Sequence, residues 1–96
     1  MKIQVKSNFV VPGLEDREHI ELDRAEMTLR QFLEKLQTLA TPSPIEYVRP
    51  GARALDPDDW EVDINGTPYQ KCERELETPL NEGDTVFIRI MALGGG

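Results

Sequence analysis

One segment of the chain has helical periodicity, and its single apolar face constrains the fold more than any other feature. Between residues 29 and 40, apolar side chains recur at the spacing i, i+3, i+4 and i+7, which places them on one side of a helix. Thr28 and Gln31 form a capping-box pattern at its start, with Met27 and Phe32 in the staple positions. Two prolines within residues 41–44 end the helix. A helix with one apolar face needs an apolar layer to cover, so we predict an α+β domain with a sheet.

Four segments alternate between apolar and polar residues, which is the period of strands with one buried face. They span residues 1–5, 19–23, 60–64 and 86–90, and a short edge strand is expected at residues 69–72. The first and last segments are strongly apolar on one face, so we expect them to lie side by side, parallel and central. This arrangement is a β-grasp, the ubiquitin-like roll, with a mixed sheet of about four to five strands covered by one main helix.

The proline-rich stretch from residue 42 to residue 59 is predicted to be a long connection, with a short helical turn at residues 52–55. Its apolar side chains should fix it to the core; they are Ile45, Tyr47, Val48 and Leu55. Because 96 residues cannot bury two separate cores, we expect a single domain. Its predicted limits are residues 1–93, and residues 94–96 are expected to form a flexible glycine tail.

The charge balance excludes two classes of binding protein. The chain has 11 Lys and Arg residues against 18 Asp and Glu residues, a formal net charge of −7. Nucleic-acid binders and proteins held on anionic lipid need the opposite sign. No apolar run is long enough to span a bilayer, and the first residues lack the apolar region of a signal peptide. Since Cys72 is the only cysteine, a reducing cytoplasm is the expected compartment.

No side-chain pattern predicts an enzyme or a metal site. Cys72 is predicted to be a bystander thiol, and His19 has no second histidine or cysteine with which to share a metal ion. The acidic run at residues 56–63 lacks the glycine and the spacing of a calcium loop, so it is predicted to be a solvated face. No phosphate-binding or nucleophile motif occurs. We therefore expect neither catalytic residues nor a cofactor.

Two sequence elements and the final glycines together resemble one known family. The elements are Val62-Asp-Ile-Asn-Gly66 and Thr78-Pro-Leu-Asn-Glu-Gly-Asp-Thr-Val86, followed by the glycines of residues 94–96. They are similar to the MoaD/ThiS family of sulfur carriers, in which a VNG strand end precedes a TPLxxGDxV turn and the chain closes with diglycine. The second element also predicts a turn on physical grounds, with a core anchor, a positive φ and an acceptor for local amides. These roles fall to Leu80, Gly83 and Asp84, in that order.

The resemblance implies that the working group is the carboxylate of Gly96. In such a carrier, an activating enzyme of the ubiquitin-activating type (MoeB-like or ThiF-like) adenylates the carboxylate, and a persulfide sulfur then replaces AMP to give a thiocarboxylate. The sulfur goes to a sulfur-accepting synthase, as in molybdopterin or thiamine biosynthesis, so the chain is a substrate rather than an enzyme. Gly94 and Gly95 would thread into the activating enzyme. The residues expected to dock on the partner are Phe87, Arg89, Met91 and Leu93, with Arg89 at the rim.

Two alternatives remain open. Molybdopterin-type carriers often have Phe-Pro-Pro before the glycines, whereas this chain has Arg89-Ile-Met-Ala-Leu93, and ubiquitin also has alternating apolar and arginine residues there. The chain could therefore be a protein modifier whose adenylate is captured by a lysine amine. It could also be an interaction module that uses the outer face of its sheet and no tail chemistry. Residues 42–59 could either fold over Phe87 and Met91 or leave the outer face open.

Overall fold

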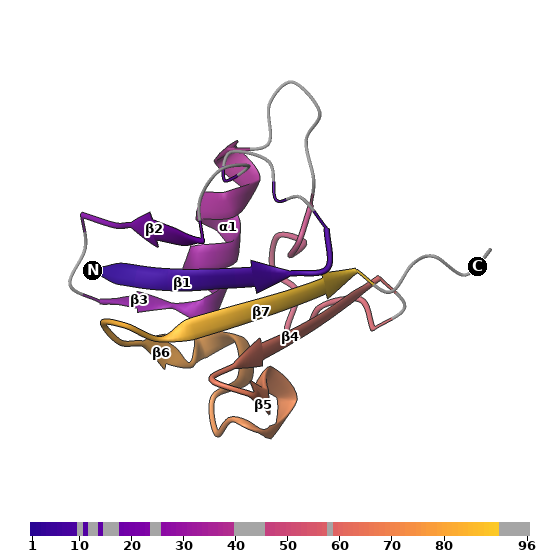
Figure 1. The fold of residues 1–96 in the computed structure, drawn as a ribbon. Helices are drawn as coiled ribbons and strands as arrows, with labels where there is room; N and C mark the ends of the chain where they lie inside the picture. Colours follow the sequence, from indigo (N-terminus) through magenta and orange to yellow (C-terminus); the bar gives the residue numbers. More distant parts are fainter. Residues whose placement is uncertain are drawn as a thin grey trace.

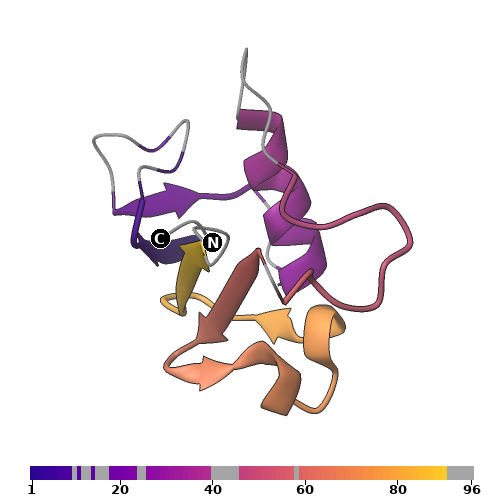
Figure 2. The ribbon, with the colours of Figure 1, turned by 90° about the vertical axis from the view of Figure 1, so that its right-hand side faces the viewer.

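The computed structural model describes residues 1–9, 11, 14, 18–23, 26–39, 46–57 and 59–90, which form an α+β structure. Its main sheet has five strands in the order β2-β1-β7-β4-β5. They are β1 Lys2–Ser7, β2 His19–Glu21, β4 Trp60–Ile64, β5 Thr67–Pro68 and β7 Thr85–Ile90. Helix α1, Leu29–Leu39, lies across one face of this sheet (Figure 1, Figure 2). For the described residues, the predicted combination of a mixed sheet and one α-helix is confirmed.

The two central strands are parallel neighbours, as the sequence predicts. β1 and β7 pair in register from Gln4 opposite Thr85 to Ser7 opposite Ile88. The pairs on either side, β1 with β2 and β7 with β4, are antiparallel. Between β1 and β2, residues 10, 12–13 and 15–17 lie outside the described part of the chain. β7 is therefore held on both sides, and its direction is fixed by two different partners.

The apolar side chains of the alternating strands form the core with the helix. Ile3 from β1 and Val86 and Ile88 from β7 are fully buried, and so are Phe32 and Leu33 from α1. Each such side chain stabilises the fold by about 1.5–3 kcal/mol when it leaves water. Because the core uses one face of the central strands, the alternate residues of β4 and β7 lie on the opposite face of the sheet.

The helix begins with the predicted capping box. The Thr28 backbone N–H donates to Gln31 Oε1 at 3.0 Å, and the Gln31 N–H donates to Thr28 Oγ1 at 3.2 Å. Met27 and Phe32, the predicted staple pair, are both buried. No described helix is long and apolar enough to cross a membrane.

A small second sheet joins the start of the helix to the later turn, and the sequence pattern did not predict it. β3, Met27–Thr28, pairs antiparallel with β6, Pro79–Leu80. Met27 lies opposite Leu80, and Leu80 is the buried anchor expected of that turn. Two residues on each side are too few to show a period, so only the packed structure identifies them as strands.

The long connection is fixed to the core, as predicted, and polar side chains assist its apolar ones. Tyr47, Val48 and Leu55 are buried; Ile45 lies outside the described residues. Gln37 Oε1 of the helix accepts the backbone N–H groups of Tyr47 and Val48 at 3.0 and 2.8 Å. The predicted helical turn at residues 52–55 is wrong: the turn lies earlier, where the Ala52 N–H donates to the Arg49 carbonyl at 3.0 Å.

The predicted edge strand at residues 69–72 is also wrong. That segment contains the 3₁₀ helix η1, Tyr69–Lys71, followed by a second one, η2, Glu75–Glu77, and the edge strand is the preceding β5. Pro68 ends β5 and has no N–H with which to extend a ladder. The Tyr69 side chain instead turns into the core, where its hydroxyl accepts the Leu55 N–H at 2.8 Å.

Candidate docking face and tail exit

The outer face of β4 and β7 carries the first group of candidate residues. Phe87 and Arg89 alternate with the buried residues of β7 and are half-buried. The antiparallel register sets Asp63 opposite Phe87 and Glu61 opposite Arg89. Residues 46–57 run along the helix side of the sheet, so this described part of the connection does not cover the outer face (Figure 2). For the described part of the connection, the structure therefore supports the second of the two possibilities, an outer face left open.

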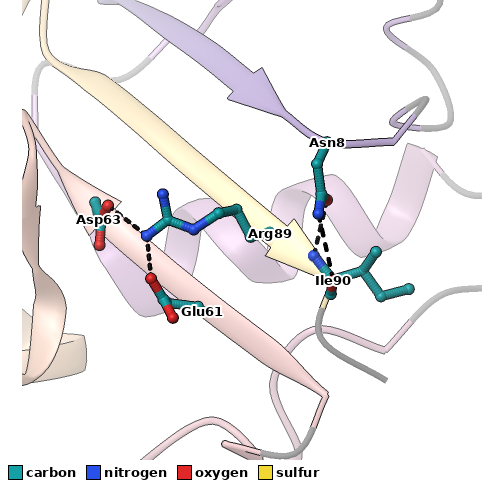
Figure 3. Close-up of polar contacts among 5 residues, drawn as sticks. All are labelled: Asn8, Glu61, Asp63, Arg89 and Ile90. Atoms are coloured by element: carbon teal, nitrogen blue, oxygen red, sulfur yellow. Dashed lines mark hydrogen bonds and ion pairs between the residues drawn. The ribbon is translucent and has the colours of Figure 1, made fainter. Parts of the chain in front are cut away.

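Arg89, which is expected from the sequence to lie at the rim of the docking contact, is held by two carboxylates. Its Nη2 donates to Asp63 Oδ2 at 2.7 Å and also to Glu61 Oε1 (Figure 3). Its guanidinium carbon lies 4.8 Å from the centre of the Phe87 ring, within range of a cation–π contact. Burial lowers the pKa of Arg89, but the hydrogen bonds and charges of Glu61 and Asp63 outweigh it and leave that pKa raised. The arginine is thus a fixed charge with a defined orientation.

Glu61 and Asp63 are the site residues that sequence reasoning missed. They were predicted to belong to a solvated acidic run, but Asp63 is only 8% exposed and both carboxylates bind Arg89. The alternation of β4 was the available signal, because residues 61 and 63 must share a face opposite Val62. One Asp63 oxygen, Oδ1, is buried with no hydrogen-bond partner among the described residues. Two carboxylates and one guanidinium give the cluster a formal charge of −1.

The end of β7 is the second candidate feature, because the glycine segment follows it in the sequence. Ile90 is the last described residue; Met91, Leu93 and the predicted carrier glycines Gly94, Gly95 and Gly96 lie outside the described part of the chain. The Ile90 N–H donates to Asn8 Oδ1 at 2.9 Å, and Asn8 Nδ2 donates to the Ile90 carbonyl at 3.4 Å (Figure 3). The position and direction of the chain at Ile90 are therefore well defined.

An aromatic group lies on the other side of Ile90. Trp60 is the strand partner of Ile90 across β4 and β7. The Trp60 ring contacts Tyr47 and Phe9, with ring centroids 4.8 and 5.7 Å apart. Burial raises the pKa of Tyr47 to about 12, and its hydroxyl has no hydrogen-bond partner in the described residues. Ile90, the last described residue, is therefore paired with a strand residue that packs in an aromatic cluster.

The two sequence elements that carry the family resemblance meet at the opposite end of β7. Asn65 and Gly66 have φ values of +51° and +86° and form the two-residue turn between β4 and β5. Asn65 Nδ2 donates to Asp84 Oδ1 at 3.0 Å, and the Thr85 N–H donates to Asn65 Oδ1 at 2.9 Å. Asp84 Oδ2 accepts the Asn81 N–H at 2.7 Å, as predicted for a local acceptor. The two elements are thus one hydrogen-bonded unit that starts β7.

The remaining chemical candidates do not converge. Cys72 is half-buried and free, with its Sγ 3.8 Å from the Pro68 carbonyl oxygen. His19 lies in the edge strand β2. Over the described ranges, no three His, Cys, Asp or Glu side chains are placed to hold a metal ion. The outer face and the end of β7 are therefore the features from which a function can be argued.

Comparisons with known proteins found no relative of this chain. No protein-family model matches the chain, and no curated protein or solved structure matches it either. Its function is accordingly argued from its own residues.

Proposed function

We propose that the chain is a β-grasp sulfur carrier of the MoaD/ThiS type, acting in the cytoplasm. The observation that carries the proposal is the position of β7, a central strand that presents Phe87 and Arg89 on a face that residues 46–57 leave open. In the sequence, three residues after β7 lead into the glycine segment. A partner that binds this face lies next to the point where the tail leaves the sheet. Docking and delivery of the tail can therefore occur in one complex.

The strand arrangement supports the β-grasp assignment within the coarser α+β fold. The parallel central pair, the antiparallel strand on each side and a helix across one face are the features expected of that roll. The contact between Asn65 and Asp84 further supports the resemblance, because it joins the two separate sequence elements by a hydrogen bond at the start of β7. Both elements are needed to start β7 in register, and β7 in turn positions the tail.

The proposed chemistry uses the Gly96 carboxylate and no side chain of this protein. A carboxylate oxygen attacks the α-phosphorus of ATP, pyrophosphate leaves, and the carbonyl carbon becomes an acyl adenylate with AMP as a good leaving group. A protein persulfide then attacks that carbon through its terminal sulfur, and AMP leaves. A thiol attacks the resulting acyl disulfide at the sulfur further from the carbonyl, which releases the thiocarboxylate and forms a new disulfide. The thiol is the reductant, and the carrier keeps one sulfur atom in place of one oxygen.

The outer face is proposed to bind the activating enzyme and then the sulfur-accepting synthase. Phe87 supplies apolar contact area, with Met91 and Leu93 beyond the described strand, and Arg89 holds the ring and the carboxylates in place. Because the cluster of Glu61, Asp63 and Arg89 has a formal charge of −1, the matching partner surface carries a basic group beside an apolar one.

The test is the intact mass of the protein after incubation with its host's extract, ATP and a sulfur source. A gain equal to the mass difference between sulfur and oxygen, absent when Gly96 is deleted, is the expected result. Heavier protein conjugates that need the same glycine would instead identify a protein modifier. An unchanged mass, in an extract shown to activate another diglycine carrier, would refute tail chemistry and leave the interaction module.

The docking face has its own matched pair of variants. Phe87→Ala should slow thiocarboxylate formation at least about tenfold, because truncation of a central aromatic contact costs upward of about 1.4 kcal/mol of binding. Lys35→Ala, on the exposed helix surface, should leave the rate unchanged. Equal rates for the two variants would show that the partner binds elsewhere.

A further inference from the structure

The last residue of β7, Ile90, extends beyond the end of the parallel neighbour β1. The β1–β7 register ends at Ser7 opposite Ile88, and β1 itself ends at Ser7. Ile90 would be left with an unpaired N–H and an unpaired carbonyl facing that side. The side chain of Asn8 supplies both missing partners, since its Oδ1 accepts at 2.9 Å and its Nδ2 donates at 3.4 Å (Figure 3). A carboxamide has one acceptor and one donor group, as a backbone peptide does, so it continues the ladder by one more residue.

Asn8 is itself held in place. The Ser7 hydroxyl donates to the Phe9 carbonyl at 2.5 Å, which closes the chain around Asn8. The Phe9 ring packs on Trp60, the residue that faces Ile90 from β4. The Asn8 carboxamide therefore approaches Ile90 from one side while Trp60 flanks it on the other.

We propose that Asn8 is a positioning residue for the tail: its carboxamide fixes the backbone at Ile90, the residue after which the C-terminal segment follows in the sequence. This inference rests on the proposed function and deepens it. A tail that starts from a fixed Ile90 samples fewer directions than one in which Ile90 itself is free to move. In a larger fraction of the docked complexes, the Gly96 carboxylate then lies inside the activating enzyme. This is the usual effect of preorganising a reactant.

The first test measures the hydrogen bonds directly. Asn8→Ala should speed amide hydrogen exchange at Ile90 about tenfold, since one ordinary backbone bond is lost. Asn8→Asp should have a smaller effect, because it keeps the acceptor for the Ile90 N–H and loses only the donor. Gln4→Ala is the matched control: it removes a carboxamide from the exposed side of β1 that bonds to no described residue, and Ile90 exchange should not change.

The second test measures the reaction. Initial rates of thiocarboxylate formation are followed by intact mass in host extract with ATP and a sulfur source, over a range of carrier concentrations. For Asn8→Ala we expect kcat to fall about five- to tenfold, because about one more residue must be ordered in each productive complex, with KM unchanged. Simple destabilisation would do the reverse: it would lower the folded fraction, raise the apparent KM and leave kcat intact.

The outcomes separate the two proposals. If the wild-type protein gains no sulfur, the proposed function fails, and the positioning role fails with it. If the wild type is converted and Asn8→Ala loses Ile90 protection but keeps its kcat, only the positioning role is overturned. Unchanged Ile90 exchange in Asn8→Ala would overturn the hydrogen-bond basis of the inference. A fall in kcat together with faster Ile90 exchange, and neither in Gln4→Ala, supports it.

Discussion

The contact between Asn65 and Asp84 gives a quantitative prediction. Asn65→Asp keeps the side-chain shape, and aspartate also tolerates the positive φ of this turn, so the backbone cost should not change. The Thr85 N–H can still donate to the new side chain. The variant loses the donor that lies 3.0 Å from Asp84 Oδ1 and puts a second carboxylate in its place.

The expected cost follows from two contributions. One lost hydrogen bond is worth about 1 kcal/mol. Two unit charges about 4 Å apart repel by about 1 kcal/mol in water and about 4 kcal/mol at an effective dielectric constant of 20. Since Asn65 is exposed and Asp84 half-buried, the lower part of that range applies. The free energy of unfolding should therefore fall by about 2–3 kcal/mol in total.

Urea unfolding followed by the fluorescence of Trp60 measures this difference, because Trp60 is the single tryptophan and is 8% exposed. The matched variant is the double substitution Asn65→Asp and Asp84→Asn, which swaps the two side chains and again pairs one amide with one carboxylate. It should recover about 2 kcal/mol of the cost of Asn65→Asp, and this recovery plus the cost of Asp84→Asn alone gives the coupling energy of the pair. If Asn65→Asp is as stable as the wild type, or if the two changes together cost the sum of each alone, the proposed coupling between the two sequence elements is incorrect.

Three further predictions concern single side chains. Because the pKa of Tyr47 is raised from 10.0 to about 12, the native state holds that proton more tightly than the unfolded chain. Stability that is fully present below pH 10 should therefore fall by about 3 kcal/mol as the pH rises to 12, and Tyr47→Phe should remove this loss in alkaline unfolding curves. Arg89→Met leaves Asp63 without its cation and should cost about 2–4 kcal/mol in urea unfolding, of which Asp63→Asn in the same chain recovers more than half. Gly83→Ala should cost about 1 kcal/mol from backbone strain at φ +85°. No steric clash should add to this cost, because an added Cβ meets no atom within 4 Å; an unchanged melting temperature would contradict the prediction.

Local chemistry explains the parts of the structure that the sequence predicts well. Two local features were predicted correctly: the capping box of Thr28 and Gln31, and the turn at Asn65 and Gly66. Their residues are at most three positions apart, so a short stretch of sequence contains all the partners. The alternation of the central strands is equally local, and it predicts which face is buried.

The incorrect predictions depend on partners distant in the sequence. Tyr69 was assigned to a strand by its composition, but its hydroxyl binds the Leu55 N–H and its segment forms a 3₁₀ turn. Asp63 looked like one of several solvated acids until the register of β4 and β7 brought it to Arg89. No sequence pattern connects Asn8 with its partner Ile90, which follows 82 residues later.

The parallel pairing of β1 with β7 has a consequence for how the chain folds. The middle of the sheet joins residues 2–7 to residues 85–90, so the two strands that organise the core are among the most distant in the sequence. β1 cannot pair with β7 until residues 85–90 have been synthesised. Closing so large a loop costs conformational entropy before the contacts between β1 and β7 can stabilise the fold. This favours slow folding for a domain of this size. Until the loop closes, the edge of β1 that pairs with β7 has no partner strand, and an unpaired edge can bind another chain.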